Sequence, residues 1–109
     1  MRIIAGKFRG KKLLKPSEKV TRPLRDLVRE SIFNIMVHSN SFDIKIEKSH
    51  VLDLFSGVGS FGLECLSRGA DNVVFIEKDK IAASTLNLQL KNARFFHGIR
   101  ESWLKSRGG

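Results

Sequence analysis

Three glycines and a distant acidic residue give the strongest chemical signal in the sequence. Gly57, Gly59 and Gly62 spell G-x-G-x-x-G between an apolar run and a helical pattern. In such a loop the first glycine makes a tight turn, the second lets the backbone approach a ligand, and the third lets the helix pack closely on the strand. Glu77 follows about 20 residues after the first glycine, where a nucleotide-binding βαβ unit places a carboxylate for ribose hydroxyls. The pattern predicts a nucleotide-cofactor site. The alternative is an ordinary strand–helix turn with glycines selected for packing.

The elements around this loop are expected to alternate between strands and helices. The apolar runs and helical stripes predict strands at about 50–55 and 73–77, helices at about 60–67 and 79–92, and a third strand starting at about 94–97. Gly69 is expected to end the first of these helices, and Asp79 to complement the dipole of the second. The alternation indicates a parallel sheet with right-handed crossovers. A helical turn is expected around Trp103 and Leu104.

The N-terminal third is expected to form a β-hairpin and an amphipathic helix. Gly6 and Gly10 mark the turn region between two short apolar segments. A helix opens at Thr21-Arg22-Pro23, and its apolar stripe is expected to face the core. That stripe contains positions 24, 27, 28, 32, 35 and 36. Arg22 and Arg29 lie off the stripe and are candidates for binding phosphate or carboxylate through a bidentate fork.

Positive charge is concentrated at the N-terminal end of the chain. The formal net charge is +9, and residues 1–25 hold nine basic residues against one acid, so nine minus one gives +8 there. A basic arm joined to a nearly neutral core favours a polyanionic substrate, most simply nucleic acid. A solvated tail that only aids solubility is the alternative. Phe8 lies among the cations and fits equally well a base-stacking role and a place in the core.

The remaining composition narrows the setting. Cys65 is the only cysteine, which excludes a disulfide within the chain, favours a reducing cytoplasmic setting and is typical of a small buried apolar residue. His38 and His50 have no spacing that implies a metal site, so we expect surface positions for both and no metal. No apolar run is long enough to span a membrane, and the N-terminus is too polar for a signal peptide.

Four segments occur together in an informative order. They read RIIAGKFRGKKL (2–13), TRPLRDLVRESIFNI (21–35), VLDLFSGVGSFGLECLSRGA (51–70) and VVFIEKD (73–79). This set resembles the bacterial methyltransferases that methylate the exocyclic N2 amine of a guanine in small-subunit ribosomal RNA with S-adenosylmethionine. The resemblance implies an α/β, Rossmann-like class I methyltransferase fold with a partial parallel sheet, preceded by a basic N-terminal β-hairpin and helix. It divides the chain into a pocket-bordering, RNA-binding part at 1–48 and a cofactor-binding part at 49–109.

The resemblance also implies roles for individual positions. Asp53 would reach the ammonium group of the cofactor and Glu77 its ribose hydroxyls. The positions that would bind the cofactor are Asp53, Phe55, Ser56, Gly57, Gly59, Gly62, Glu77 and Lys78. Those that would contact RNA or border the target-base pocket are Arg2, Lys7, Arg9, Lys11, Lys12, Thr21, Arg22, Pro23 and Arg29. The implied partner is ribosomal RNA or the small ribosomal subunit.

The chain departs from the family pattern in its last third. The family carries an acid for the adenine amine after the third strand, where this sequence has Ile99. It also carries an Asn/Asp-Pro-Pro-Tyr/Phe motif that holds the target amine, whereas the only prolines here are Pro16 and Pro23. We therefore expect a truncated methyltransferase domain with no identified catalytic residue. The alternative is a natural short homologue that pairs its open sheet edge with a second copy as a homodimer.

Three hypotheses for the function follow. The leading one is an S-adenosylmethionine-dependent RNA methyltransferase that is catalytically incomplete in this chain. The second is a non-enzymatic basic RNA-binding module, for which the N-terminal arm suffices. The third is a dinucleotide-dependent dehydrogenase, which shares the glycine pattern and the acid, although the D-x-F-x-G-x-G context at 53–59 argues against it.

Overall fold

The structure is a computed structural model that describes residues 1–14, 26–38, 44–93 and 97–101. Several expectations fall outside these ranges. They concern the start of the first helix at Thr21, Arg22 and Pro23, the residues at 94–96, and the turn around Trp103 and Leu104.

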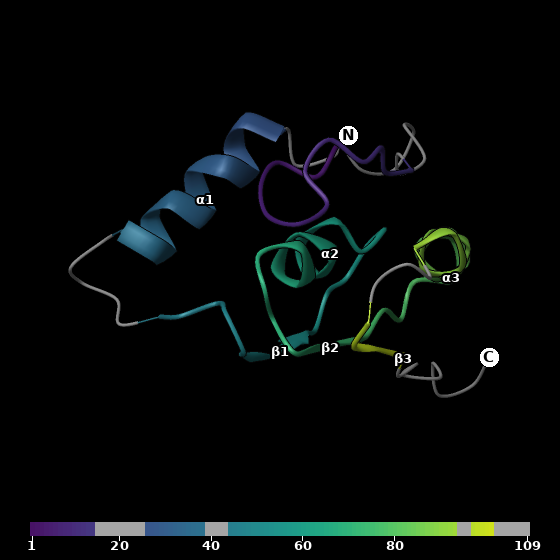
Figure 1. The fold of residues 1–109 in the computed structure, drawn as a ribbon. Coiled ribbons are helices and arrows are strands. Elements are labelled where there is room, and N and C mark those ends of the chain that lie inside the picture. Colours follow the sequence, from purple (N-terminus) through teal and green to yellow (C-terminus); the bar gives the residue numbers. More distant parts are fainter. Residues whose placement is uncertain (15–25, 39–43, 94–96, 102–109) are drawn as a thin grey trace.

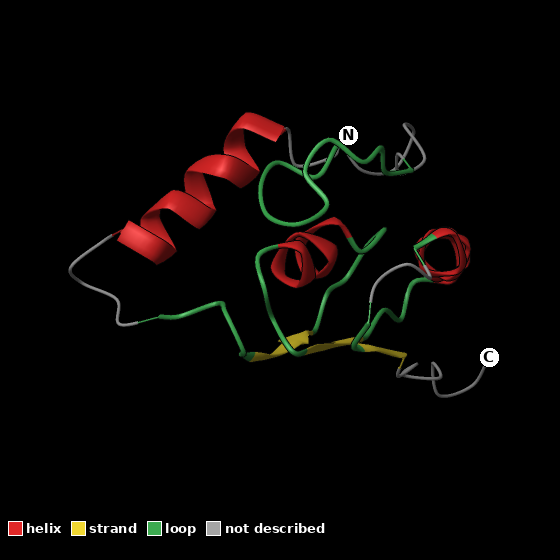
Figure 2. Cartoon of the chain, viewed as in Figure 1, coloured by secondary structure: helices red, strands yellow, loops and turns green. Residues whose placement is uncertain are grey.

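Helices and strands alternate after the first helix, as the sequence predicts. The order is α1 (Asp26–His38), β1 (His50–Asp53), α2 (Ser60–Ser67), β2 (Asn72–Phe75), α3 (Lys80–Asn92) and β3 (Ile99–Glu101). Figure 2 shows the strands (yellow) side by side, with loops (green) leading from them to the helices (red) above. The third strand begins at Ile99, later than the expected start at 94–97. Its position is determined by pairing with β2, because Val73 donates a hydrogen bond to the carbonyl of Gly98 just before β3.

The three strands form one parallel sheet in the order β1-β2-β3. Asp53 pairs with Phe75 and Phe75 pairs with Glu101, so the carboxyl ends of all three strands meet at one edge. Loops at the carboxyl ends of parallel strands are where α/β folds bind ligands. The expected parallel α/β arrangement is therefore present, and it brings the β1–α2 loop to this edge.

All the described helices lie on one side of the sheet (Figure 1). Val73 and Phe75 of β2 point toward this side and are buried, together with Leu63 of α2 and Leu86 and Leu90 of α3. The opposite face is not covered by any described residue, and Leu52 in the middle of β1 is 57% exposed. β1 is also an edge strand of the described sheet. The core is therefore one-sided.

Local signals account for both helix ends that border the sheet. After α2, the N–H of Gly69 bonds to the carbonyl of Leu66 and the N–H of Ala70 to that of Cys65, which is the Schellman pattern. Gly69 has φ +108°, which favours glycine. Asp79 caps α3 by accepting a hydrogen bond from the N–H of Ala82 at 2.8 Å. Both expectations from the sequence are confirmed.

The buried face of α1 differs from the apolar stripe. Val28 and Ile35 of that stripe are 44% and 56% exposed, whereas Arg29 and Phe33 have no exposed surface. The Phe33 ring stacks on Phe61 of α2 with centroids 4.9 Å apart. The expectation is wrong for Val28 and Ile35, whereas Ile32 and Met36 of the stripe are half-buried. Partners on α2, rather than the number of apolar side chains, determine which face of α1 is most deeply buried.

Residues 1–14 form a loop rather than a regular β-hairpin. The described residues there make one isolated antiparallel bridge, between Arg2 and Lys12. Three further hydrogen bonds join Ile3 to Lys11, Gly10 to Ile3, and Leu13 to Met1. We call residues 1–14 the basic loop. In Figure 1 it lies over α2, on the side away from the sheet.

Candidate functional site

The loop that joins β1 to α2 folds back onto the end of β2. The Ser56 hydroxyl donates to the Asp53 carbonyl at 2.8 Å and accepts from the N–H of Ile76 at 3.0 Å. The N–H of Ser56 also donates to the carbonyl of Ile76 at 3.1 Å. One small side chain therefore ties together the carboxyl ends of two neighbouring strands, and the loop that follows has a defined starting point.

The glycines of this loop have different tasks. Gly57 has φ +56°, and a Cβ there would meet nothing within 4 Å, so the backbone borders open space. Gly59 has φ +89°, and a Cβ there would lie 2.7 Å from Leu86 Cδ1. At Gly62 a Cβ would lie 2.4 Å from Phe75 Cε1. Gly62 thus has the expected helix–strand packing role. Gly57 rather than Gly59 has the backbone that a ligand can approach.

Glu77 sits against this loop and holds it in place. Its Oε1 accepts a hydrogen bond from the N–H of Gly57 at 2.8 Å, and its Oε2 accepts one from the N–H of Asp79 at 2.8 Å. Each carboxylate oxygen keeps a second acceptor site. The carboxylate is therefore preorganised for a further donor such as a hydroxyl. Lys78, the next residue, is exposed at the same edge.

Asp53 is the second acidic group at this edge, and its environment is unusual. Burial raises the pKa of Asp53 to about 6, and the charge of Glu77 raises it further, against the lowering effect of the N–H groups of Gly62 and Phe55. Its Oδ2 is buried and accepts no hydrogen bond from the part of the chain that the structure describes. A buried carboxylate oxygen without a donor is costly unless a ligand supplies one. The donor that best suits it is a cation such as an ammonium group.

The outer rim of this edge is apolar. Phe55 is 83% exposed, and Leu54 beside it is 51% exposed. The backbone of Gly57, the two carboxylates and this rim all lie at the carboxyl edge of the sheet. The two carboxylates can accept hydrogen bonds from an ammonium group and from hydroxyls, and the rim can contact a flat apolar part of a ligand. This edge contains six of the eight cofactor-binding positions expected from the sequence, namely Asp53, Phe55, Ser56, Gly57, Glu77 and Lys78.

The register of the third strand places an acidic residue near the carboxyl edge of the sheet. Ile99 begins β3 opposite Val73, whereas Glu101 ends β3 opposite Phe75. The acidic residue at the carboxyl edge of this strand is therefore Glu101, two positions beyond the one aligned from the sequence.

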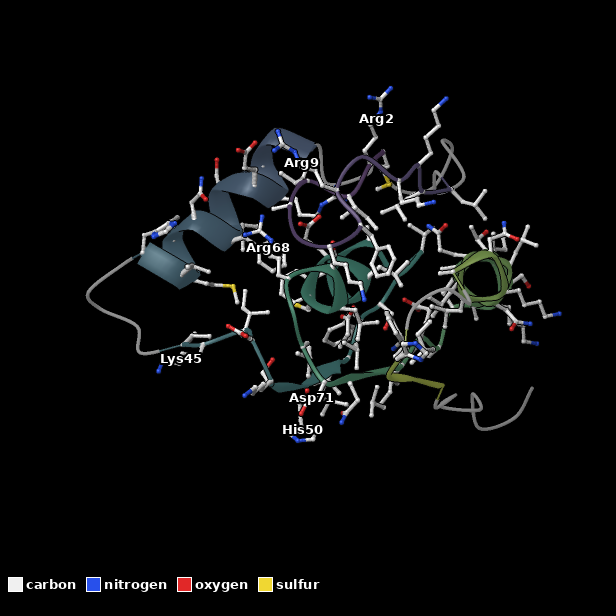
Figure 3. The ribbon with its side chains drawn as sticks, in the orientation of Figure 1. Arg2, Arg9, Lys45, His50, Arg68 and Asp71 are labelled. Atoms are coloured by element: carbon white, nitrogen blue, oxygen red, sulfur yellow. The ribbon has the colours of Figure 1, made fainter. Side chains whose placement is uncertain are left out.

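The five expected RNA-contacting cations of the basic loop are all exposed. They are Arg2, Lys7, Arg9, Lys11 and Lys12. Figure 3 shows Arg2 and Arg9 projecting from the loop on the side away from the sheet. Phe8 is partly buried and packs against the core, with Lys7 Nζ 5.7 Å from its ring centroid. Of the two roles considered for Phe8, the structure supports packing in the core.

Arg29 does not have the position of an RNA ligand. Its side chain has no exposed surface, and its Nε lies 3.7 Å from Glu64 Oε1. Its Nη2 donates to the carbonyl of Arg2. The guanidinium therefore lies in the interior, where it forms an ion pair with a buried carboxylate and donates to a loop carbonyl. The expectation of an RNA contact is corrected.

Two polar residues of α2 were missed by the reasoning from sequence. Glu64 and Ser67 are buried, and both bond to the basic loop. The available signal was the single acid in the otherwise apolar run SFGLECLS of α2. A charged residue is almost never fully buried unless it is paired. The backbone partners of Glu64, the N–H groups of Ile4 and Ala5, are about sixty positions away in sequence, whereas Arg68 is a local partner.

Comparisons with known proteins agree with this geometry. Residues 1–106 match the family described as "Conserved hypothetical protein 95". A curated relative, the ribosomal RNA small subunit methyltransferase D of Haemophilus influenzae, is 40% identical over 94 residues. The chain belongs to the family described as "Conserved hypothetical protein 95". The match covers 86% of the chain and 46% of that relative.

Other members of the family give the same result. The methyltransferase D of Escherichia coli K12 is 36% identical over 113 residues, covering 99% of this chain and 54% of that relative. The chain thus spans about half the length of the curated relatives that it matches. Among solved structures, a putative methyltransferase, yhhF, from Escherichia coli superposes with a TM-score of 0.71 at 34% identity, over 93% of this chain and 50% of that one.

The residues that the structure describes contain no group of three or more His, Cys, Asp or Glu side chains that could hold a metal ion. Among the helices of the described ranges, none has the length and apolar character needed to cross a membrane.

Proposed function

We propose that the chain binds S-adenosylmethionine at the carboxyl edge of its sheet and small-subunit ribosomal RNA through the basic loop. The observation that carries the cofactor proposal is the pair of carboxylates around Gly57. Asp53 presents a buried oxygen without a donor, and Glu77 is held 2.8 Å from the loop backbone. Asp53 would take the ammonium group and Glu77 the ribose hydroxyls. The relatives' names supply the RNA class.

The reaction proposed for the family type is methyl transfer to guanine N2. When bound, the cofactor supplies an activated methyl group on its sulfonium, so the protein mainly has to orient the reactants and exclude competing groups. In this chain Ser56, Gly57 and Glu77 would fix the donor at the edge of the sheet. The 109 residues contain no Pro-Pro pair and no tyrosine, so they lack the motif that would hold the target amine. We expect this chain by itself to bind cofactor and RNA without efficient turnover.

Calorimetric titration with S-adenosylhomocysteine tests the cofactor site. Asp53→Ala and Glu77→Ala are each expected to weaken binding at least tenfold, since each loses a charge-assisted hydrogen bond. Asp71→Ala and Glu47→Ala are the matched controls, because both residues are exposed and lie away from the carboxyl edge. Equal affinity in all four variants would contradict the proposal. NAD is the control ligand, and tighter binding of NAD would favour the dehydrogenase hypothesis.

A non-enzymatic RNA-binding module is the second candidate, and the five exposed cations of the basic loop favour it. Replacing Lys7 and Arg9 together by glutamate is expected to weaken RNA binding and to lower the slope of log affinity against log salt by about 1.4, at about 0.7 per phosphate contact on a single strand. Lys80 and Lys91 on α3 are also exposed, and their replacement by glutamate gives the same change in charge. If both double variants lose the same affinity, net charge rather than the basic loop determines RNA binding.

A further inference from the structure

A buried carboxylate on α2 holds the basic loop in place. Glu64 has no exposed surface, and its Oε1 accepts from the N–H of Ile4 at 2.8 Å. Its Oε2 accepts from the N–H of Ala5 at 3.0 Å and from Arg68 Nε at 2.9 Å. Arg29 of α1 approaches the same carboxylate at 3.7 Å. Three parts of the chain therefore meet at one acidic side chain.

One helical turn later, Ser67 makes a second attachment. Its hydroxyl donates to the carbonyl of Ala5 at 2.6 Å and accepts from the N–H of Phe8 at 3.0 Å. Its own carbonyl accepts from the N–H of Lys7 at 2.7 Å. The backbone of the loop is thus bonded to α2 at Ile4, Ala5, Lys7 and Phe8, immediately beside exposed cations. Arg68 lies between α1 and the basic loop in Figure 3.

These contacts replace the support that a sheet would give. The bridge between Arg2 and Lys12 and the three hydrogen bonds beside it join residues 1–3 to residues 10–13, and none of them holds the backbone between residues 4 and 8. Buried hydrogen bonds to a charged group are stronger than neutral ones. The path of the loop between residues 4 and 8 is therefore determined mainly by α2.

The same helix also begins the cofactor loop. α2 starts at Ser60, directly after Gly59. At 1.5 Å per residue, Glu64 lies about 7.5 Å along the helix axis from Gly59. A rigid helix of this length fixes the distance between the cations of the basic loop and the carboxyl edge of the sheet.

We propose that Glu64 and Ser67 are positioning residues that fix the RNA-binding cations relative to the cofactor loop. The inference rests on the proposed function, because it assumes that the basic loop binds RNA. Neither residue touches RNA or cofactor. They act through the backbone of residues 4–8. Replacing either residue is therefore expected to weaken RNA binding and to leave cofactor affinity unchanged.

Glu64→Gln tests the proposal against Glu30→Gln, whose residue is exposed on α1. Both variants lose one negative charge, so the change in net charge by itself would strengthen RNA binding in both. Loss of position is expected to weaken RNA binding roughly tenfold in Glu64→Gln only and to lower its salt slope by about 0.7. S-adenosylhomocysteine affinity is expected to stay within about twofold of the wild type. RNA affinity that rises equally in both variants would overturn the proposal.

Ser67→Ala is the second variant and decides the question if Glu64→Gln does not fold. Its control is Ser84→Ala, because Ser84 is exposed on α3 and its hydroxyl donates to the carbonyl of Lys80 within the same helix. Ser67→Ala leaves the charge unchanged and is expected to weaken RNA binding several-fold with cofactor affinity retained. Equal RNA affinity in Ser67→Ala and Ser84→Ala would overturn the role of Ser67.

Amide hydrogen exchange distinguishes this inference from the proposed function. At least one of the amides of Ile4 and Ala5 is expected to exchange at least tenfold faster in Glu64→Gln than in Glu30→Gln, because glutamine keeps one acceptor oxygen and replaces the other with an NH2 group that cannot accept. Unchanged exchange would show that Glu64 does not hold the loop. A wild-type chain that protects these amides yet has no salt-dependent RNA affinity would overturn the proposed function, and with it the purpose assigned to the attachment.

Discussion

Asp53→Asn is expected to stabilise the fold while it damages the cofactor site. Burial raises the pKa of Asp53 from 3.8 to about 6. Between these values the folded chain binds more protons than the unfolded chain, so the stability of the wild type falls as pH rises through that window. At about 1.4 kcal/mol per pKa unit the shift corresponds to about 3 kcal/mol. Solvent reaches part of this carboxyl, so we expect roughly 2 kcal/mol to be realised.

Urea unfolding of the wild type and Asp53→Asn at pH 4.5 and pH 8 measures this effect. The free energy of unfolding of the variant minus that of the wild type is expected to be larger at pH 8, by roughly 1 kcal/mol, because Asp53 of the unfolded chain is already mostly ionised at pH 4.5. Any effect of the amide on packing is the same at both pH values, so it cancels when the two differences are compared. The contribution of every other titrating group cancels between variant and wild type, provided that the substitution leaves its pKa unchanged. A difference that is equal at the two pH values, or larger at pH 4.5, would refute the reasoning. Calorimetry at pH 8 should show that Asp53→Asn binds S-adenosylhomocysteine more weakly than the wild type does.

Three other expectations concern the fold that supports the site. Gly62→Ala should destabilise by roughly 1–3 kcal/mol in urea unfolding, because its Cβ would lie 2.4 Å from Phe75 Cε1; no loss would show that the ring moves freely. Asp79→Ala should lower the free energy of unfolding by about 1 kcal/mol in urea unfolding, because α3 loses its N-cap. An unchanged free energy of unfolding would argue against the cap. Burial raises the pKa of Cys65 to about 12, so iodoacetamide at pH 8 should label it only after unfolding; fast labelling of the folded chain would contradict its burial.

Local signals predicted the elements around the site well. The sequence places a helix at 60–67 and the structure has Ser60–Ser67, since the glycine loop before it and Gly69 after it are short-range signals. Glu77 was identified from its spacing, and in the structure its carboxylate bonds to Gly57. In these cases the information lies within about 20 residues of the site.

Features that depend on distant partners were not predictable in the same way. α1 buries Arg29 and Phe33 because Glu64 and Phe61 of α2 lie opposite, and no periodicity in α1 encodes them. Likewise, β3 starts at Ile99 because of its register with Val73. Glu64 escaped notice because an acid on a helix is normally solvated, and only the folded chain shows that the basic loop surrounds it.

The one-sided sheet has a consequence for the lifetime of the chain in a cell. Leu52 and Leu54 expose apolar surface at the β1 edge, where the backbone is also open to pairing. Quality-control chaperones and proteases continuously sort molecules that fold only marginally. The cellular amount of this chain would then depend on how soon the exposed face of the sheet is covered. A polypeptide that covers this face would raise the amount of the chain even if it changed no reaction rate. Leu52→Lys should lengthen the half-life in a pulse–chase experiment, and an unchanged half-life would show that this face is not what limits it.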